Sequence, residues 1–173
     1  MIELHRPELL DPAAHDRSHF DSGAPVLDDW LRRYAGQSRR RDTAATWVVT
    51  DLDGEVMAFA SVAMTGLDRS AAPPTVAQNS PDPVPALLLA RLAVDRRVGG
   101  IGVGTALVAH VLATAVELNV RAACRAVVVN ALDAAARSWW QRLGFRPFDP
   151  DDQTGLDLYL LTSDIESTLR HLR

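Results

Sequence analysis

A cluster of glycines between two apolar segments is the part of the sequence best suited to chemistry. Four glycines lie within residues 99–104, after the apolar stretch 86–94 and directly before the expected helix 103–119. At such a strand–loop–helix passage, backbone N–H groups point at a ligand above the helix N-terminus, where the helix dipole adds partial positive charge. Glycine also lets a ligand approach the backbone closely, because no Cβ intervenes. The expected ligand group is a phosphate or pyrophosphate.

The spacing of these glycines excludes one class of phosphate site and disfavours another. A nucleoside-triphosphate loop, GxxxxGK[ST], requires a lysine, and the chain contains none. A dinucleotide loop requires GxGxxG; counted from Gly102 the third glycine falls on Leu107, and from Gly100 it falls on Thr105. The cluster is therefore either a loop for another phosphate ligand or simply a tight turn.

Arginine supplies all 18 basic residues, although the net charge is −4. Residues 32–142 carry 13 arginines against nine acids, whereas residues 147–166 carry six acids and no base. An acidic protein with such an uneven distribution can still present a basic face. We interpret the densest basic stretch either as a solvated helix end or as a contact to RNA phosphates. Its members are Arg32, Arg33, Arg39, Arg40 and Arg41.

The other reactive side chains indicate structure more than chemistry. Cys124 opens an apolar strand, so a role as nucleophile is disfavoured. His110, Tyr34 and Tyr159 lie on apolar faces and are expected to pack, and Asp133 is expected to cap a helix. The remaining histidines have no metal-ligand spacing with the cysteine, and we expect no metal site.

The elements that must position these residues follow from the hydrophobic pattern. Short strands are expected at 2–4, 46–51, 55–64, 86–94, 124–129 and 155–161. Helices are expected from Pro25, over 103–119, over 133–143 with Gly144 as the closing residue, and after a cap at Ser163. In the first of these helices one face is apolar, formed by Leu27, Trp30, Leu31 and Tyr34. Asp53-Gly54 is expected to form a two-residue hairpin turn, and residues 65–84 an irregular stretch. The order predicts a mixed α/β sheet with an antiparallel N-terminal pair and helices on both faces.

Composition limits the class of protein. The chain has 173 residues, 47% of them hydrophobic and 23% charged, which suits one domain over 1–173 with a substantial core. The hydrophobic fraction excludes a mostly disordered chain. The single cysteine excludes a disulfide scaffold. We find no apolar run long enough for a membrane span, and the N-terminus is too acidic for a signal peptide. We therefore expect a cytoplasmic protein without membrane association.

The chain resembles the GNAT-fold acyltransferases over almost its whole length and most strongly over 85–148, through the stretches LLLARLAVD, GGIGVGTALVAHVL and VVVNALDAAARSWWQRLGFRPF. That family's loop pattern, Gln/Arg-x-x-Gly-x-Gly/Ala, maps onto residues 99–104, with both glycines matched and Gly99 at the position of the Gln or Arg. More narrowly, FDSG at 20–23, LDDWL at 27–31 and TWVV at 46–49 are similar to the GNAT toxins of type II toxin–antitoxin systems.

This resemblance implies an acetyl-CoA-dependent N-acetyltransferase that acetylates the amino group of aminoacyl-tRNA. It also implies a homodimer and a ribbon–helix–helix antitoxin as partner. The strand backbone would bind the pantetheine arm, and the loop would bind the pyrophosphate, with Arg96 or Arg97 supplying charge in place of Gly99. The implied coenzyme-binding residues are Leu92, Ala93, Val94, Arg97, Gly99, Gly100, Ile101, Gly102, Val103, Gly104 and Thr105.

The sequence departs from the family at its general acid. The family places a tyrosine near the start of FYExxGF, and the matching run here is WWQRLGF over 139–145, with Trp140 at the tyrosine position. An indole N–H donates a hydrogen bond but does not release a proton at neutral pH. Trp140 therefore either orients the sulfur beside a water or only packs. Two alternatives stay open: an acetyltransferase for small amines or protein N-termini, and a catalytically weak protein that binds acetyl-CoA or a partner.

Overall fold

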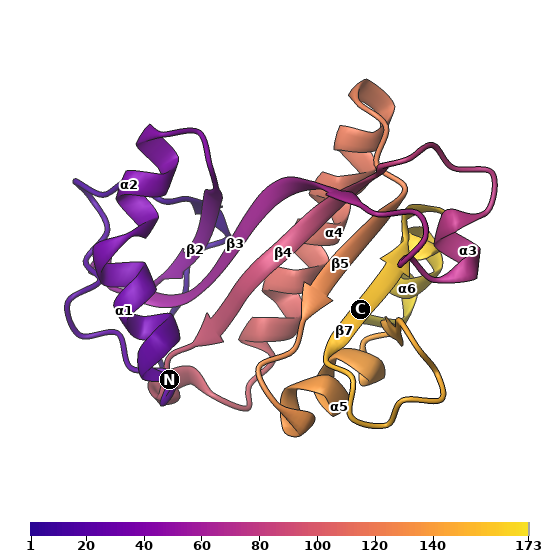
Figure 1. Cartoon of the computed structure of the whole chain (residues 1–173). Helices are drawn as coiled ribbons and strands as arrows, with labels where there is room; N and C mark the ends of the chain where they lie inside the picture. Colours follow the sequence, from indigo (N-terminus) through magenta and orange to yellow (C-terminus); the bar gives the residue numbers. More distant parts are fainter. Residues whose placement is uncertain (173) are drawn as a thin grey trace. The chain divides into compact units, whose positions relative to one another are not determined.

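The computed structural model describes residues 1–172, and Figure 1 shows its elements in chain order. The strands are β1 (Glu8–Leu9), β2 (Ala45–Thr50), β3 (Val56–Leu67), β4 (Val84–Val94), β5 (Ala126–Asn130), β6 (Arg146–Pro147) and β7 (Asp157–Leu161). The helices are α1 (Pro25–Arg33), α2 (Ala35–Arg40), α3 (Pro74–Ala77), α4 (Val103–Arg121), α5 (Ala134–Arg142) and α6 (Ile165–Leu172), with 3₁₀ turns η1 (Arg96–Val98) and η2 (Thr162–Asp164).

The seven strands have the order β1-β2-β3-β4-β5-β7-β6. The pair β4–β5 is parallel, whereas β1–β2, β2–β3, β5–β7 and β6–β7 are antiparallel. This confirms the mixed α/β sheet with an antiparallel N-terminal pair. The described chain divides into two compact units, the first formed by 1–63 and 90–110 and the second by 64–89 and 111–172. The single domain expected over 1–173 stays a prediction.

The core of the first unit lies between α1, α2 and the antiparallel strands. Pro25 begins α1, where its missing N–H is harmless. Leu31 of this helix is fully buried, and Phe20 packs edge-on against Phe59 of β3 with ring centroids 5.6 Å apart. Trp30 stacks on the same Phe59 at 5.9 Å. The expected apolar face of α1 is thus confirmed, except that Tyr34 is 50% exposed and does not pack as expected.

The hairpin between β2 and β3 has a three-residue loop, so the expected two-residue turn at Asp53-Gly54 is wrong. Asp51 N–H donates to the carbonyl of Glu55 at 3.0 Å, and Gly54 N–H donates to the carbonyl of Asp51 at 3.2 Å. The Asp51 carboxylate also accepts from the backbone N–H groups of Asp53 and Glu55. Gly54 has φ +84°, the left-handed conformation that closes three-residue hairpins.

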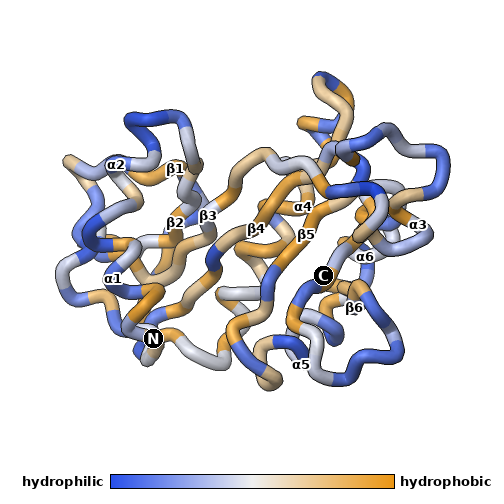
Figure 2. The backbone as a smooth tube through the Cα atoms, viewed as in Figure 1, coloured by the Kyte–Doolittle hydropathy of each residue, from blue (hydrophilic) through white to orange (hydrophobic). Residues whose placement is uncertain are grey.

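The second unit is built on apolar strands, and Figure 2 shows β5 as hydrophobic except at its end, where Asn130 is exposed. The parallel register of β4 and β5 runs from Ala86↔Ala126 to Leu89↔Val129. Asp133 caps α5 by accepting from Ala136 N–H at 2.8 Å, and Gly144 ends the helix with φ +101°, so both expectations are confirmed. The irregular stretch is shorter than expected, because β3 extends to Leu67 and α3 occupies Pro74–Ala77.

Helix α4 contradicts the expectation that no segment is long and apolar enough to cross a membrane. By length and composition alone its 19 residues, Val103–Arg121, pass that test. A core helix of a folded protein passes it equally well, and Leu107, Val108 and Leu112 of α4 are fully buried in this structure. Its apolar character therefore fits burial within the fold.

Two expectations near the ends of the chain are wrong. The N-terminal segment forms only an isolated bridge, Leu4↔Asp51, and its paired strand is β1 at Glu8–Leu9. Ser163 lies inside the 3₁₀ turn η2 instead of capping the last helix. The neighbouring Thr162 hydroxyl donates to the Cys124 carbonyl at 2.6 Å, which ties the turn to the start of β5.

Candidate active site

The glycine loop between β4 and α4 is held open by left-handed backbone. Gly100 has φ +75° and Gly102 has φ +90°, a region that side chains with a Cβ rarely adopt. A Cβ built on either residue would meet no other atom within 4 Å, so the space above both is free. Ile101 between them is 63% exposed. The loop thus presents its backbone to solvent, as a phosphate ligand requires.

The loop leads directly into the first turn of a long helix. Ala106 N–H donates to the carbonyl of Gly102 at 3.0 Å. The amides of Val103, Gly104 and Thr105 precede this bond and have no intrahelical acceptor, as at every helix N-terminus. Together with the helix dipole they favour an anion. This arrangement fits the pyrophosphate of acetyl-CoA, which would lie over residues 99–105.

Strand β4 supplies the second feature that the coenzyme needs. Its parallel register with β5 ends at Leu89↔Val129, but β4 continues to Val94. The segment 90–94 therefore offers backbone groups beyond that register, including those of Leu92, Ala93 and Val94. An extended pantetheine arm would bind such groups in the way an added strand does.

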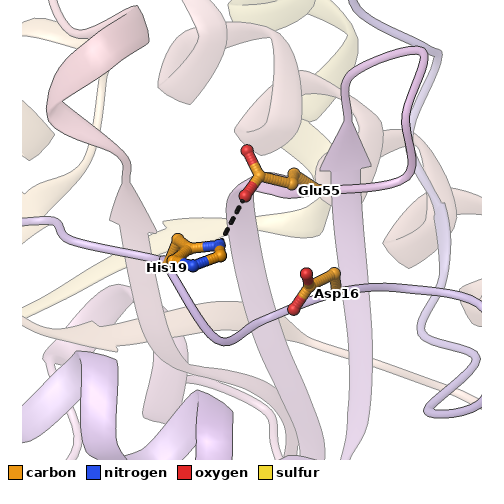
Figure 3. Close-up of side chains that lie close together, drawn as sticks. All are labelled: Asp16, His19 and Glu55. Atoms are coloured by element: carbon orange, nitrogen blue, oxygen red, sulfur yellow. Dashed lines mark hydrogen bonds and ion pairs between the residues drawn. The ribbon is translucent and has the colours of Figure 1, made fainter.

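Three side chains that could hold a cation lie beside the hairpin. Asp16, His19 and Glu55 each bring one ligand atom within 4.8 Å of the others (Figure 3). The His19 Nδ1 and Glu55 Oε1 atoms are 2.9 Å apart, and the other Glu55 oxygen accepts from Arg97 Nη1 at 2.6 Å. Arg97 shares its positive charge between Glu55 and Asp95, so these contacts form a hydrogen-bonded network around one cation.

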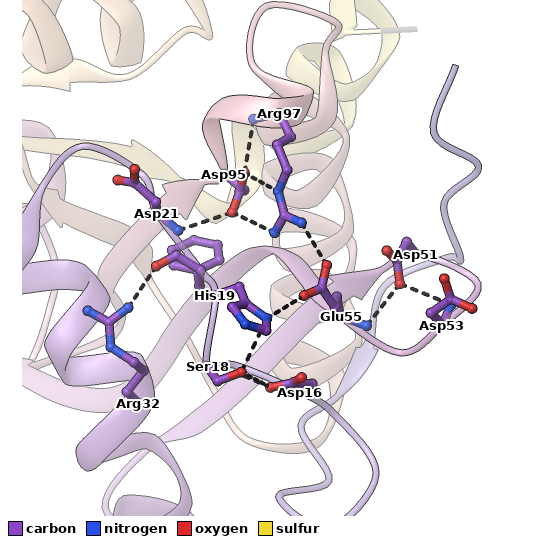
Figure 4. A network of polar contacts seen from close by, with 11 residues as sticks. Asp16, Ser18, His19, Asp21, Arg32, Asp51, Asp53, Glu55, Asp95 and Arg97 are labelled. Atoms are coloured by element: carbon purple, nitrogen blue, oxygen red, sulfur yellow. Dashed lines mark hydrogen bonds and ion pairs between the residues drawn. The ribbon is translucent and has the colours of Figure 1, made fainter.

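Asp95 is the centre of this network and fixes the start of the glycine loop (Figure 4). Its carboxylate is only 2% exposed and accepts from Arg97 Nε at 2.9 Å, Arg97 Nη2 at 3.0 Å and Arg97 N–H at 2.9 Å. It also accepts from Asp21 N–H at 3.0 Å. Burial raises the pKa of Asp95, but these hydrogen bonds outweigh it and hold the pKa below its ordinary value.

The guanidinium of Arg97 consequently donates its hydrogen bonds to carboxylates of the protein itself. Hydrogen bonds to Asp95 and then Glu55 raise the pKa of its guanidinium above the ordinary range. Arg96 is more exposed and makes only a 3.6 Å ion pair with Asp21. Of the two arginines considered for the pyrophosphate, Arg96 therefore has the less committed side chain, and direct contact by Arg97 stays a prediction.

We expect Asp95→Asn to lower the free energy of unfolding by about 2–4 kcal/mol, because it leaves buried donors facing an amide. The Asp95 pKa is depressed on folding, so its stabilisation is present above the ordinary pKa of 3.8 and is lost as pH falls through the folded value. The difference between wild type and variant should therefore shrink below about pH 4. Urea unfolding at pH 7 and pH 3 measures it, with exposed Asp53→Asn as the matched control. An equal loss for both variants at pH 7 would contradict the assignment.

The arginine stretch does not act as one group. Arg32 donates to the Phe20 carbonyl at 2.7 Å and pairs with Asp29 at 3.4 Å, so it fixes the segment before α1. The other four are exposed, and within residues 1–172 none of their side chains has a hydrogen-bond or ion-pair partner. Figure 2 shows the end of α2 and the loop after it as hydrophilic. These four are Arg33, Arg39, Arg40 and Arg41.

Trp140 lies in an aromatic cluster of the second unit. It is 5% exposed, and its ring centroid is 4.9 Å from that of Trp139 and 5.0 Å from that of Phe145, both edge-on. Within residues 1–172 no group accepts a hydrogen bond from its indole N–H. The cluster supports the packing role, and the free N–H leaves the orienting role open.

The remaining candidates pack as expected. His110 contacts Trp47 with ring centroids 4.3 Å apart, and the Tyr159 hydroxyl lies 2.8 Å from the Thr75 hydroxyl. Cys124 is buried, which raises its pKa, and its Sγ–H donates to the Ala126 carbonyl. A thiol in this state is a poor nucleophile.

Sequence reasoning missed the residues that hold the site in place. Asp95 was recognisable by position, as an acid directly after a buried strand and before the glycines. The ion pair of Glu55 with Arg97, at 2.6 Å, and the contact of Arg91 with Trp30, at 4.3 Å, join residues far apart in the chain. No local pattern signals such pairs.

The fold and the loop define the class of protein. Residues 6–145 match the acetyltransferase (GNAT) family, and the chain belongs to this family. It is therefore an acyltransferase that uses acetyl-CoA.

Particular relatives narrow the comparison. The chain is 36% identical, over 158 residues, to a tRNA-acetylating toxin of Mycobacterium tuberculosis, covering 90% of this chain and 92% of that protein. A tyrosine-to-phenylalanine mutant of KacT superposes with a TM-score of 0.86 at 25% identity, over 95% of this chain and 98% of that one. AtaT complexed with acetyl-methionyl-tRNAfMet gives 0.84 at 24% identity, with the same coverage, and this likeness shows the fold.

Proposed function

We propose that this chain transfers an acetyl group from acetyl-CoA to the amino group of an aminoacyl-tRNA, as a toxin of a type II toxin–antitoxin pair. The observation that carries the proposal is the 36% identity, over 90% of the chain, to a tRNA-acetylating toxin. The open glycine loop and the part of β4 that extends beyond its register with β5 support it, because they suit the coenzyme. The four unpaired arginines at and after α1 suit an RNA.

The chemistry divides between the coenzyme and the protein. Acetyl-CoA supplies a thioester whose carbonyl a neutral amine attacks, so that a C–N bond forms, the C–S bond breaks and the amine proton is released. Backbone amides of residues 99–105 would hold the pyrophosphate, and Leu92, Ala93 and Val94 would align the pantetheine arm. Asp95 and Arg97 keep the loop in its binding conformation before the ligand arrives, which lowers the cost of binding.

The test is the transfer of labelled acetyl from acetyl-CoA to bulk charged tRNA. We expect label in the aminoacyl-tRNA fraction that is released by mild base together with the amino acid. Deacylated tRNA, free amines and peptide N-termini serve as matched acceptors. Label on a small amine or peptide alone would mean that the acceptor is that amine and not aminoacyl-tRNA. Label on none of the acceptors would favour a catalytically weak protein that binds acetyl-CoA.

One observation favours that weaker reading as a second candidate. Trp140 occupies the position at which the family has its tyrosine, and it is buried against Trp139 and Phe145. A protein of this fold with no general acid could still bind acetyl-CoA. A thiolate leaves without direct protonation, however, because a thiol has an ordinary pKa near 8.5, so slow transfer is the expected result.

We also propose the partners that this function requires. AtaT has been solved bound to the C-terminus of the antitoxin AtaR, and KacTA in complex with DNA. A ribbon–helix–helix antitoxin for this chain, and a homodimer, remain part of the proposal. An enzyme that acts on aminoacyl-tRNA works in the cytoplasm, which is where we place it.

We expect reversal of Arg39, Arg40 and Arg41 to Glu to weaken tRNA binding and to flatten its dependence on salt, because each arginine neutralises backbone charge. Acetyl-CoA affinity should stay unchanged. Fluorescence anisotropy with labelled tRNA at three salt concentrations measures the slope, and calorimetry measures the coenzyme. If affinity and slope are both retained, the stretch is a solvated helix end.

A further inference from the structure

Arg91 lies in a stack of three side chains in the first unit. Its guanidinium carbon is 4.3 Å from the centroid of the Trp30 ring, and Trp30 in turn lies nearly parallel to Phe59, with centroids 5.9 Å apart and planes at 16°. Phe59 is fully buried, whereas Trp30 and Arg91 are half-buried. The stack therefore holds the guanidinium over an aromatic ring that itself rests on the buried core.

The charge of Arg91 has no counter-charge within residues 1–172. No carboxylate pairs with it and no oxygen accepts a hydrogen bond from it, whereas Arg32, Arg96 and Arg97 each face a carboxylate. Burial lowers the pKa of Arg91, but a guanidinium stays charged at any physiological pH. A half-buried cation with no counter-charge raises the free energy of the folded protein, and an anionic ligand would offset this cost.

The unused donors of Arg91 determine what that ligand can be. The guanidinium lies over the Trp30 ring, and within residues 1–172 none of its N–H groups donates a hydrogen bond. A planar fork of such donors matches two oxygens of a phosphate, and a side chain already held against a ring loses little entropy on binding. Lysine could not make this contact, because its ammonium is a point charge without the fork.

Arg91 lies next to segments assigned to both phosphate-bearing substrates, acetyl-CoA and the RNA acceptor. It directly precedes Leu92–Val94, the segment assigned to the pantetheine arm, and it rests on α1, the helix that leads to Arg33 and to the Arg39–Arg41 run. The loop amides over 99–105 already suit the coenzyme pyrophosphate. The phosphates left for Arg91 are the ribose 3′-phosphate of the coenzyme and those of the acceptor, and the contact of Arg91 with α1, which leads to the basic run, favours the acceptor.

We propose that Arg91, held over the Trp30 ring, binds a backbone phosphate of the RNA acceptor and thereby positions the acceptor end beside the coenzyme strand. This inference rests on the proposed function. Phosphate could also come from acetyl-CoA, and the two sources are separated by measuring each ligand alone.

The experiment compares Arg91→Gln, Arg91→Lys and the control Arg121→Gln, which removes an exposed, unpaired arginine at the end of α4. We expect Arg91→Gln to weaken binding of bulk tRNA about tenfold and to reduce the slope of log K against log salt by about 1. Arg91→Lys should restore the slope but not the affinity. Arg121→Gln should leave both unchanged, and thermal melts establish that each variant is folded.

Each outcome decides the assignment. Unchanged tRNA affinity and slope in folded Arg91→Gln would overturn it, and a loss of acetyl-CoA affinity alone would move the phosphate to the coenzyme and overturn the RNA contact. Full rescue by lysine would refute the bidentate geometry. Failure of the proposed function looks different: the wild type would bind tRNA with normal dependence on Arg91 but transfer no label to it.

Discussion

Replacing Gly102 by valine is expected to raise the dissociation constant for acetyl-CoA at least about 100-fold, a loss of roughly 2.7 kcal/mol. Gly102 has φ +90°, and a Cβ there would project into empty space. In the proposed binding mode, that space is where the pyrophosphate would approach the loop amides. A branched side chain would fill it and would also strain the backbone, so hydrogen bonds to a charged ligand would be lost.

The matched control for this variant is Gly144→Val at the end of α5. Gly144 has φ +101°, so valine imposes a similar backbone strain there, next to the Thr168 side chain and outside the glycine loop and the Asp95–Arg97–Glu55 network. Both variants should lose comparable stability in thermal melts, and only Gly102→Val should lose coenzyme binding by calorimetry. Unchanged binding in Gly102→Val would remove the loop from the coenzyme site.

The second large effect concerns Trp140, where a tyrosine should increase acetyl transfer. Trp140→Tyr introduces a phenol that can protonate the leaving thiolate, and we expect kcat to rise by up to about 10²-fold, within the range of general acid catalysis. The smaller ring leaves space beside Trp139 and Phe145, so a stability cost of about 1–2 kcal/mol should accompany the gain. Steady-state transfer to charged tRNA measures the rate.

Trp140→Phe is the control that separates the two roles of the indole. Phenylalanine keeps an aromatic ring in the cluster but removes the N–H, which has no partner within the described protein. An unchanged kcat would mean that the ring only packs, and a lower kcat would mean that the N–H orients the sulfur or a water. A large loss of activity in Trp140→Tyr would show that tryptophan has a role of its own.

The strand–loop–helix passage was predictable because its signals are local. The apolar run of β4, the glycines and the apolar periodicity of α4 lie consecutively over residues 84–121, and each dictates its own conformation. Asp133 and Gly144 were likewise identified as the two ends of α5, because caps depend on the residue itself and its nearest neighbours.

The errors share the opposite cause. The hairpin loop gained a residue because the Asp51 carboxylate captures two backbone amides, which competes with a two-residue turn. Arg32 was predicted to contact RNA with the other arginines, but in the folded chain it binds the Phe20 carbonyl and Asp29. The lack of a counter-charge for Arg91 within residues 1–172 could not be identified from the sequence, since it depends on which side chains the tertiary structure brings together.

The anchoring of Asp95 has a consequence for the order of folding. Its carboxylate binds the amide of Asp21, 74 positions earlier, and its partner Arg97 reaches Glu55, 42 positions earlier. Contacts of such separation require large loops to close first, and they form late unless other packing brings the ends together. An excised peptide containing β4, the glycines and α4 would therefore retain the motif but not its shape. We therefore expect the glycine loop to reach its folded conformation only after the segment around Asp21 has packed against Asp95. Nascent or truncated chains that lack this contact should not bind acetyl-CoA.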